Sequence, residues 1–219
     1  MKKMVLFTRP KHNLETKYLH YFSDGLIKEI KSIGEVTPID LEGKNANRLN
    51  LEKALRKVNP RLVILNGHGT KEYIYGHNDE IILDENNINI LDSKIIYAVV
   101  CDSNEGLGKI SITNGGADSF IGYGAQFMII TDPTCTTSPA RDKNCHPFKQ
   151  VYVMLIASLL AGLTVKESIE KTKDLTRKLI REYGVYGIRD KYGDAPLIRL
   201  GLFWDMYFLN ANGNLDTIF

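Results

Sequence analysis

Two short apolar runs, each ending in a reactive side chain, constrain this sequence more than any other feature. Residues 62–65 lead into Gly67, His68 and Gly69, and residues 95–100 lead into Cys101. An unbroken apolar run bounded by polar residues or glycine is typical of a strand buried on both faces, as in a parallel sheet. Because ligands bind at the carboxyl ends of such strands, His68 and Cys101 are expected at one edge of one sheet. A thiol and an imidazole are the minimum for catalysis by a cysteine nucleophile.

The first third of the chain alternates between short apolar runs, typical of strands, and apolar residues at helical spacing. We expect strands at 4–8 and 36–41, a third strand that begins at 62 and ends at His68, and helices at 13–33 and 49–58. Pro38 places the second of these strands towards an edge, because proline cannot donate to a sheet ladder. The order strand, helix, strand, helix, strand implies parallel strands joined by right-handed crossovers.

The remaining elements complete a single α/β domain over residues 1–219. We expect a β-hairpin at 71–83, a short helix at 88–92, a strand ending at Cys101, a helix at 104–113, strands at 119–123 and 127–131, a loop at 132–147, helices at 148–161 and 164–183, a loop at 183–193, a strand at 197–209, a turn at 210–214 and a final short strand. The fold class is therefore α/β, with a mostly parallel central sheet, helices on both faces and a C-terminal β-hairpin.

Composition excludes several classes of protein. The 219 residues include 28 Lys and Arg and 26 Asp and Glu, and the net charge of +2 gives no electrostatic basis for nucleic-acid binding. Three cysteines, an odd number, argue against a disulfide framework and for a reducing compartment. The apolar stretches are too short for a signal peptide or a membrane span. We expect a soluble cytoplasmic protein with no membrane partner.

A thiol needs help to act as a nucleophile at neutral pH, since its ordinary pKa lies above about 8. We expect Cys101 between a strand and the N-terminus of the next helix, capped by Asp102 or Ser103, where the helix dipole favours a thiolate. His68 would pair with that thiolate and later donate a proton to the leaving group. The backbone amides of Gly69 and Cys101 are the candidates for an oxyanion hole.

These motifs, taken in order, resemble the caspase-like cysteine peptidases, a clan with caspases, metacaspases, gingipains, clostripain, separase and the CHAT-domain proteases. The resemblance rests on the Gly-His-Gly run, a cysteine one βα unit later, the hairpin between them, and the segments 116–123 and 193–200. It implies a three-layer sandwich and an endopeptidase acting on protein or peptide substrates. The caspase pentapeptide is absent, because Cys101 is followed by Asp102-Ser103-Asn104, so specificity for aspartate is not implied.

Peptidases related by this resemblance use acidic pockets to select arginine or lysine before the cut bond, since a carboxylate pairs well with guanidinium. Asp132, at the end of an expected strand, is the first candidate for that role, and Asp102, beside the nucleophile, is the second. The alternative for Asp132 is a turn or capping residue before Pro133.

The loop at 132–147 matches a region where caspase-like chains are often cut during maturation. Its proline, serine and threonine content is typical of an exposed loop, and Arg141 and Lys143 offer basic cut sites. The alternative is a loop that is never cut. Because no sensor or repeat domain is evident, we expect activation by a partner protein, a cation or processing.

Other readings use the same residues differently. His12, His20 and His77 are interpreted as surface residues, and Cys135 with Cys145-His146 is too sparse for a zinc site, so no metal or cofactor is predicted. A catalytically silent interaction module on the same fold is the main alternative. A nucleotide-binding domain is a third, disfavoured because the segment after the first strand, 8–11, contains no glycine.

Overall fold

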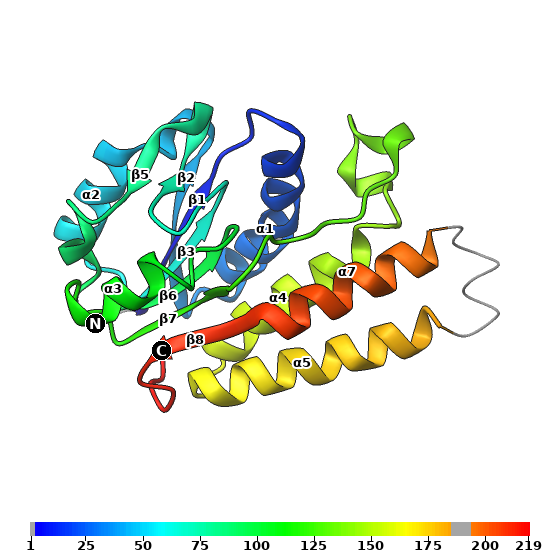
Figure 1. Ribbon diagram of the computed structural model, residues 1–219. Coiled ribbons are helices and arrows are strands. Elements are labelled where there is room, and N and C mark those ends of the chain that lie inside the picture. Colours follow the sequence, from blue (N-terminus) through cyan, green and yellow to red (C-terminus); the bar gives the residue numbers. More distant parts are fainter. Residues whose placement is uncertain (1–2, 185–193) are drawn as a thin grey trace.

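The computed structural model describes residues 3–184 and 194–219 and is built around a six-stranded sheet (Figure 1). Its strands are β1 (Lys3–Arg9), β2 (Val36–Glu42), β3 (Leu62–Asn66), β6 (Ile95–Val99), β7 (Ser119–Tyr123) and β8 (Leu209–Gly213). They are ordered β2-β1-β3-β6-β7-β8; the first five run parallel, and β8 pairs antiparallel with β7. The predicted α/β class and mostly parallel sheet are confirmed.

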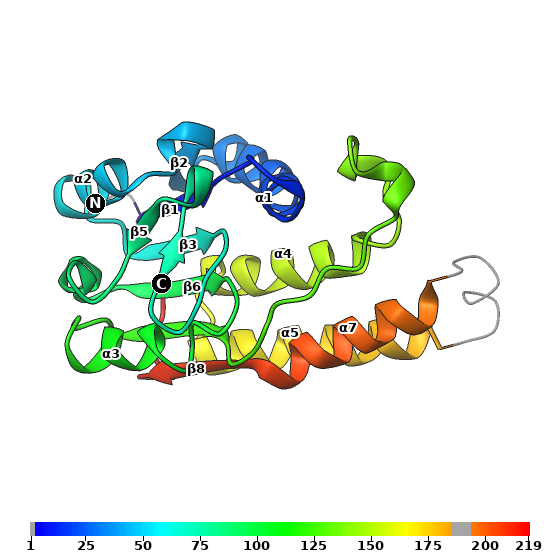
Figure 2. The ribbon, with the colours of Figure 1, turned by 45° about the horizontal axis from the view of Figure 1, so that its top comes forward.

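Helices cover both faces of this sheet (Figures 1 and 2). Helices α1 (Leu14–Ile33), α4 (His146–Leu160), α5 (Val165–Glu182) and α7 (Ala195–Phe208) contribute to one apolar cluster, whereas α2 (Arg48–Lys57) and α3 (Leu107–Thr113) contribute to a second. Consecutive strand residues point to opposite faces, so strands β1, β3, β6 and β7 contribute to both clusters. Phe7, Ile64 and Tyr97 enter the first cluster, and their chain neighbours Leu6, Val63 and Ile96 enter the second.

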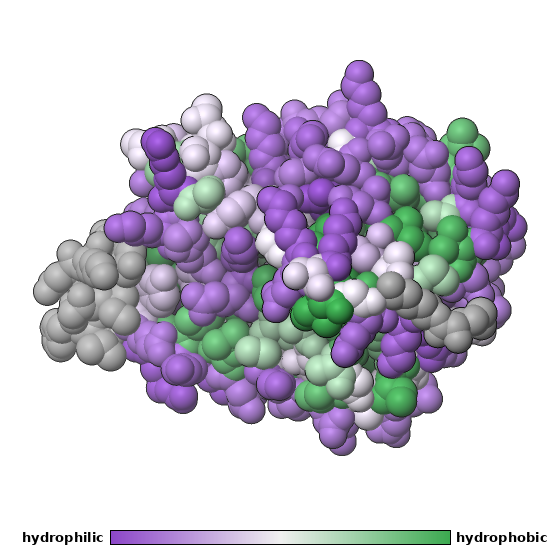
Figure 3. All heavy atoms as spheres, turned by 180° about the vertical axis from the view of Figure 1, so that it is seen from behind, coloured by the Kyte–Doolittle hydropathy of each residue, from purple (hydrophilic) through white to green (hydrophobic). Residues whose placement is uncertain are grey.

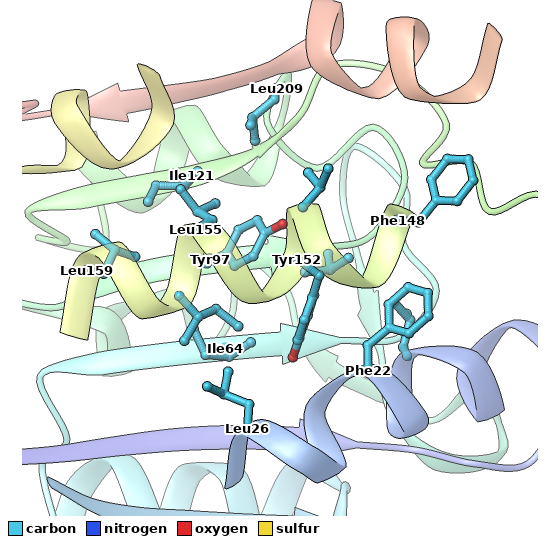
Figure 4. Packing of buried hydrophobic residues seen from close by; sticks show 14 of the residues in the cluster. Phe22, Leu26, Ile64, Tyr97, Ile121, Phe148, Tyr152, Leu155, Leu159 and Leu209 are labelled. Atoms are coloured by element: carbon cyan, nitrogen blue, oxygen red, sulfur yellow. The ribbon is translucent and has the colours of Figure 1, made fainter. Parts of the chain in front are cut away.

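The first cluster holds the sheet against α1 and α4. Figure 4 shows Tyr97 and Ile64 on the strands facing Tyr152 and Leu155 on α4, with Phe22 on α1 beside them. All five side chains are almost completely buried. At roughly 1.5–3 kcal/mol for each large apolar side chain removed from water, this cluster fixes the strands whose ends carry the site.

Two local predictions are confirmed. The hairpin consists of β4 (Ile74–Tyr75) and β5 (Ile81–Leu83), antiparallel and joined through the 3₁₀ turn η2 (His77–Asp79). The strand with Pro38 lies at the edge of the sheet, paired only with β1. Further 3₁₀ turns are η1 (Gly43–Asn45), η3 (Ile88–Leu91), η4 (Pro133–Cys135) and η5 (Pro139–Arg141).

The predicted strand at 197–209 is wrong, because this segment forms helix α7. Its buried residues, Ala195, Ile198, Leu202 and Asp205, recur every three or four positions, which is the helical period. The opposite face is also apolar, with Leu197, Leu200, Phe203 and Tyr207 exposed, and it hides this period in the sequence.

The predicted strand at 127–131 and the predicted C-terminal hairpin are also wrong. Strand β7 already pairs with β6 on one side and β8 on the other, so the segment 127–131 that follows it finds no free edge beside β7. That segment instead runs as irregular backbone, with the Met128 amide donating to the Asp205 carboxylate. Residues 210–213, predicted as a turn, belong to β8, and no strand follows among residues 214–219.

Two loop predictions have different outcomes. The predicted loop at 132–147 is a loop with two 3₁₀ turns up to residue 145, after which α4 begins, whereas residues 185–193 of the predicted loop at 183–193 lie outside the described residues. Among the described helices, none is long and apolar enough to cross a membrane. The face in Figure 3 is largely hydrophilic, with apolar patches between the charged side chains.

Candidate functional site

The two reactive strand ends lie next to each other because β3 and β6 are neighbours in register. Leu62 pairs with Ile95 and Asn66 pairs with Val99, so both strands stop at the same level. His68 and Cys101 each follow two residues later. The parallel pairing therefore brings both side chains to the carboxyl edge of the sheet.

Gly69 allows the two strand ends to approach closely. A Cβ atom at this position would lie 2.8 Å from Cβ of Val100 and 3.2 Å from the carbonyl oxygen of Cys101. Both distances are shorter than ordinary contacts between carbon and its neighbours. Only glycine therefore lets the backbone after His68 pass directly over the backbone at Cys101.

His68 and Cys101 open into one cavity of about 330 Å³. The cavity is enclosed by the first turns of α1, the two strand ends and the irregular segment after β7. It is lined by Leu14, Glu15, Tyr18, Leu19, Gly67, His68, Val99, Val100, Cys101, Gln126, Phe127, Met128, Ile129 and Thr131. A ligand entering it meets both the thiol of Cys101 and the imidazole of His68.

His68 is held by Asn13, the N-cap residue of α1. The side-chain oxygen of Asn13 accepts hydrogen bonds from the Thr16 amide at 3.0 Å and the Thr16 hydroxyl at 2.7 Å. Its amide nitrogen therefore faces His68 and donates to Nε2 at 2.5 Å. In this arrangement Nε2 is an acceptor, so the proton of the neutral ring lies on Nδ1.

Cys101 is in a different environment from the one predicted. Helix α3 begins only at Leu107, after a turn, so the dipole at its N-terminus does not act on the thiol. Burial raises the pKa of Cys101; the backbone amide of Phe127 opposes this shift, and the charge of Asp102 adds to it. The thiol is therefore protonated at neutral pH, and neither Asp102 nor Ser103 caps α3.

The backbone around the cysteine supports part of the predicted oxyanion hole. Gly69 and Ile74 form an antiparallel bridge whose hydrogen bonds run from Tyr75 to His68 and from Thr70 to Tyr73. The amide of Gly69 takes no part in this bridge. Directly after Cys101, Asp102 adopts a left-handed conformation with φ of 55°, a strained geometry typical of functional sites.

The structure places the two predicted specificity residues away from the cavity lining. Asp132 is the N-cap of η4, and its carboxylate accepts from the amide and hydroxyl of Thr134. Asp102 lies in the turn behind Cys101. The acidic side chain in the lining is that of Glu15, in the first turn of α1. Sequence reasoning missed it, although a helix that follows β1 begins at the same sheet edge as His68.

The loop at 132–147 is anchored by one buried carboxylate. Asp142 accepts hydrogen bonds from the Tyr18 hydroxyl at 2.6 Å and the Asp132 amide at 2.8 Å. Its neighbours Arg141 and Lys143, the predicted cut sites, are exposed on either side. The loop therefore presents basic side chains to solvent while its middle is bonded to α1.

The remaining cysteines lie in the same loop. Cys145 is buried, and its thiol donates to the carbonyl oxygen of Asp142 at 3.2 Å. Burial raises the pKa of Cys145 to about 12, so this thiol is inert at neutral pH. Cys135, on η4, is partly exposed. Neither thiol lines the cavity with Cys101.

Comparison with known proteins adds no family to this description. No model of a known protein family matches the chain, and no curated protein matches it. The site must therefore be judged on its own geometry and chemistry.

Proposed function

We propose that this chain is a cysteine endopeptidase with Cys101 as nucleophile and His68 as its acid–base partner, on a caspase-like sandwich. One observation carries the proposal: two adjacent parallel strands end in these residues, and both side chains line one cavity at the carboxyl edge of the sheet. Active sites of open α/β sheets lie at this edge. The close approach of the two strand ends at Gly69 supports the proposal, because no side chain other than that of glycine fits at this position.

The proposed reaction is peptide-bond hydrolysis in two steps. The Cys101 sulfur attacks the carbonyl carbon, and His68 takes the thiol proton and passes it to the departing amine. The amides of Gly69 and Cys101 stabilise the oxyanion. Water, deprotonated by His68, then attacks the thioester, which releases the acid and returns the proton to sulfur.

The resting arrangement supports the expectation that activation is needed. The Cys101 thiol is protonated because burial raises its pKa. The lone pair on Nε2 of His68 is occupied by Asn13, and Nδ1 carries the ring proton. Neither nitrogen is ready to accept the thiol proton, so a partner protein, a cation or processing would have to displace Asn13 or turn the ring.

A preference for arginine or lysine before the cut bond is proposed through Glu15 rather than through Asp132 or Asp102. Glu15 is a residue of the cavity lining, and its carboxylate would pair with a guanidinium or ammonium group. A peptide library tests this idea. The wild type should prefer basic residues, and Glu15→Gln should lose most of that preference, whereas Asp132→Asn should keep it. An unchanged profile in Glu15→Gln would remove Glu15 from the substrate pocket.

The central experiment is labelling with a peptidyl acyloxymethyl ketone, which alkylates an activated catalytic thiol. The wild type should be modified at Cys101, as located by peptide mass spectrometry, and Cys101→Ala should not. Cys135→Ala is the matched control, because that thiol is partly exposed and lies outside the cavity. Labelling that disappears in Cys135→Ala instead would contradict the proposal.

The silent interaction module remains the second candidate, favoured by the same resting arrangement of a protonated thiol and an occupied imidazole. A silent module would bind peptides without cutting them. Binding with no cleavage after prolonged incubation, and no labelling of Cys101 at any pH below about 8.5, its ordinary pKa, would favour this alternative.

A further inference from the structure

The side chains of His12, His68 and Asp79, which come from three separate segments, lie close together. His12 lies in the connection between β1 and α1, His68 follows β3, and Asp79 lies in η2 at the tip of the hairpin. One potential ligand atom from each lies within 4.8 Å of the other two. The hairpin folds over the carboxyl edge of the sheet and closes the group.

His12 has an unusual hydrogen-bonding state within this group. Its side chain is only 12% exposed, and its Nε2 lies 3.1 Å from a carboxylate oxygen of Asp79. The other ring nitrogen, Nδ1, is buried and has no hydrogen-bond partner within the described part of the chain. A buried polar atom without a partner costs roughly 1–3 kcal/mol, which a bound ligand would recover.

We infer that His12, His68 and Asp79 form a binding site for a divalent metal ion of the zinc type. Two imidazoles and one carboxylate are a ligand set that zinc prefers, with a fourth position left for water. Calcium and magnesium prefer oxygen ligands throughout. Zinc bonds of 2.0–2.2 Å place tetrahedral ligand atoms roughly 3.3 Å apart, so side chains already within 4.8 Å need only small rotations.

The neighbouring ring of His77 holds His12 in place without joining the ligand set. The two rings pack edge to face with centroids 5.2 Å apart, and Nδ1 of His77 faces the Lys11 amide at 3.5 Å. Such outer contacts orient ligating side chains in metal sites. His12 and His77, interpreted from the sequence as surface residues, thus belong to one cluster with His68.

The shared use of His68 gives the metal a regulatory consequence, which rests on the proposed peptidase function. An imidazole nitrogen bound to zinc has no lone pair for a proton, and the ion opposes an imidazolium beside it. An occupied site therefore prevents His68 from acting as acid or base for Cys101. Zinc is an inhibitor of the peptidase in this scheme.

Binding is tested first, without any use of activity. Competition of the full chain with a chromogenic zinc chelator should show one site. Asp79→Asn should weaken it at least about tenfold and His12→Ala about a hundredfold, since each removes a ligand. Asp79 is 61% exposed and has a left-handed φ that asparagine tolerates, so Asp79→Asn should fold normally.

Two control variants make the assignment specific. His20→Ala should bind zinc within about twofold of the wild type, because His20 bonds Glu42 outside the cluster. Cys101→Ala should bind zinc within about threefold, because the thiol is not a ligand. Absence of a site, or equal losses in His20→Ala and His12→Ala, would overturn the inference. A large loss in Cys101→Ala would overturn this ligand set.

The effect on catalysis is tested second, with each variant compared with its own rate in chelator. Zinc should inhibit the wild type, and the half-inhibitory concentration should rise in Asp79→Asn by the same factor as its Kd. Zinc bound without inhibition would overturn the shared role of His68. A chain that binds zinc with the expected variant pattern but cuts no peptide, even in chelator, would refute the peptidase and leave the metal site standing.

Discussion

The two sides of the candidate site differ in polarity. The histidine side is polar: His68 contacts Asn13, and one polar atom each of His12 and Asp79 lies within 4.8 Å of a ring nitrogen of His68. The cysteine side is apolar and desolvated: Cys101 follows two buried valines, and burial is the main cause of its raised pKa. A hydrogen-bonded imidazole therefore lies at the same sheet edge as a buried, protonated thiol.

Because of this difference, we expect regulation of the site to act on the histidine side, whereas the cysteine side supplies the nucleophile. Hydrogen bonds and ions act on the histidine side, where side chains can exchange partners at low cost. On the cysteine side, burial is the main influence on the thiol and the charge of Asp102 is a smaller one. Removal of the thiol should abolish activity, whereas substitutions that change the partners of His68 or the charge beside Cys101 should tune it.

The largest effect is expected from Cys101→Ala. It should lower kcat/KM for any cleaved peptide by at least about 10³-fold, because no other group supplies the nucleophile. The fold should be kept, since the change removes a single sulfur atom from a partly buried site. Peptidase assays together with thermal unfolding provide the measurement, and cleavage near the wild-type rate by a pure variant would refute the role of Cys101.

Gly69→Ala breaks the contact between the two sides. The added methyl group would lie 2.8 Å from Val100, so the backbone after His68 must move away from Cys101. A displacement of about 1 Å costs about 10²-fold in rate for groups that act together. Gly162→Ala is no suitable control because of its left-handed φ; Gly25→Ala, with open space at its Cβ position, is suitable and should leave kcat unchanged.

The pH dependence of alkylation tests the state of the thiol. Because the pKa of Cys101 is raised, the thiolate is a small fraction at neutral pH and grows as the pH increases. Iodoacetamide modification of Cys101 should therefore accelerate about tenfold per pH unit between about pH 6 and 8, without a plateau. A rate that is flat across this range would indicate a preformed thiolate and would remove the contrast between the two sides.

Asn13→Ser tests the histidine side while keeping the helix cap. Serine is an effective N-cap, so the free energy of unfolding should fall only by about the 1 kcal/mol of the lost hydrogen bond to His68, as measured with urea. The hydrogen bond to His68 is lost, and Nε2 becomes available to the thiol proton. At about 1 kcal/mol for that bond, alkylation of Cys101 should accelerate about fivefold at neutral pH. Slower alkylation would mean that Asn13 aligns the ring instead of occupying it.

The smallest effect is expected from Asp102→Asn. The negative charge of Asp102 contributes to the raised pKa of Cys101, and its removal should increase the alkylation rate about twofold. Asparagine tolerates the left-handed φ of 55°, so the turn is preserved. The twofold gain should shrink at high salt, which screens the charge.

The parallel core of the fold follows from local pattern. The strands before His68 and Cys101 are buried on both faces, and an unbroken apolar run in the sequence is typical of such strands. Helix α7 was missed because its exposed face is as apolar as its buried one. The segment 127–131 was mistaken for a strand because pairing depends on which edges are free, and the arrival of β8 from far along the chain decides that.

The site shows the same limit. Each half of the proposed dyad is visible in the sequence, because each lies two residues after a buried strand. The partners of the histidine are not visible, since Asn13 is separated from it by 55 residues and meets it only after α1 docks. The cap motif at Asn13 and Thr16 is a local signal, but it indicates the start of a helix and carries no information about which side chain lies across from it.

The buried hydrogen bonds of Asp142 should make proteolysis of the surrounding loop slow, because the loop must open locally before it can be cut. Proteases need several successive residues in extended form; the 3₁₀ turn η5 precedes Asp142, and the hydrogen bond from Tyr18 to Asp142 ties the segment to α1. The rate of nicking there reports how often this anchor opens, rather than how accessible the basic side chains are. Exposure of a side chain and susceptibility of its backbone to proteolysis are therefore separate properties in this loop. Tyr18→Phe should increase the rate of nicking beside Arg141 and Lys143 without changing the exposed surface.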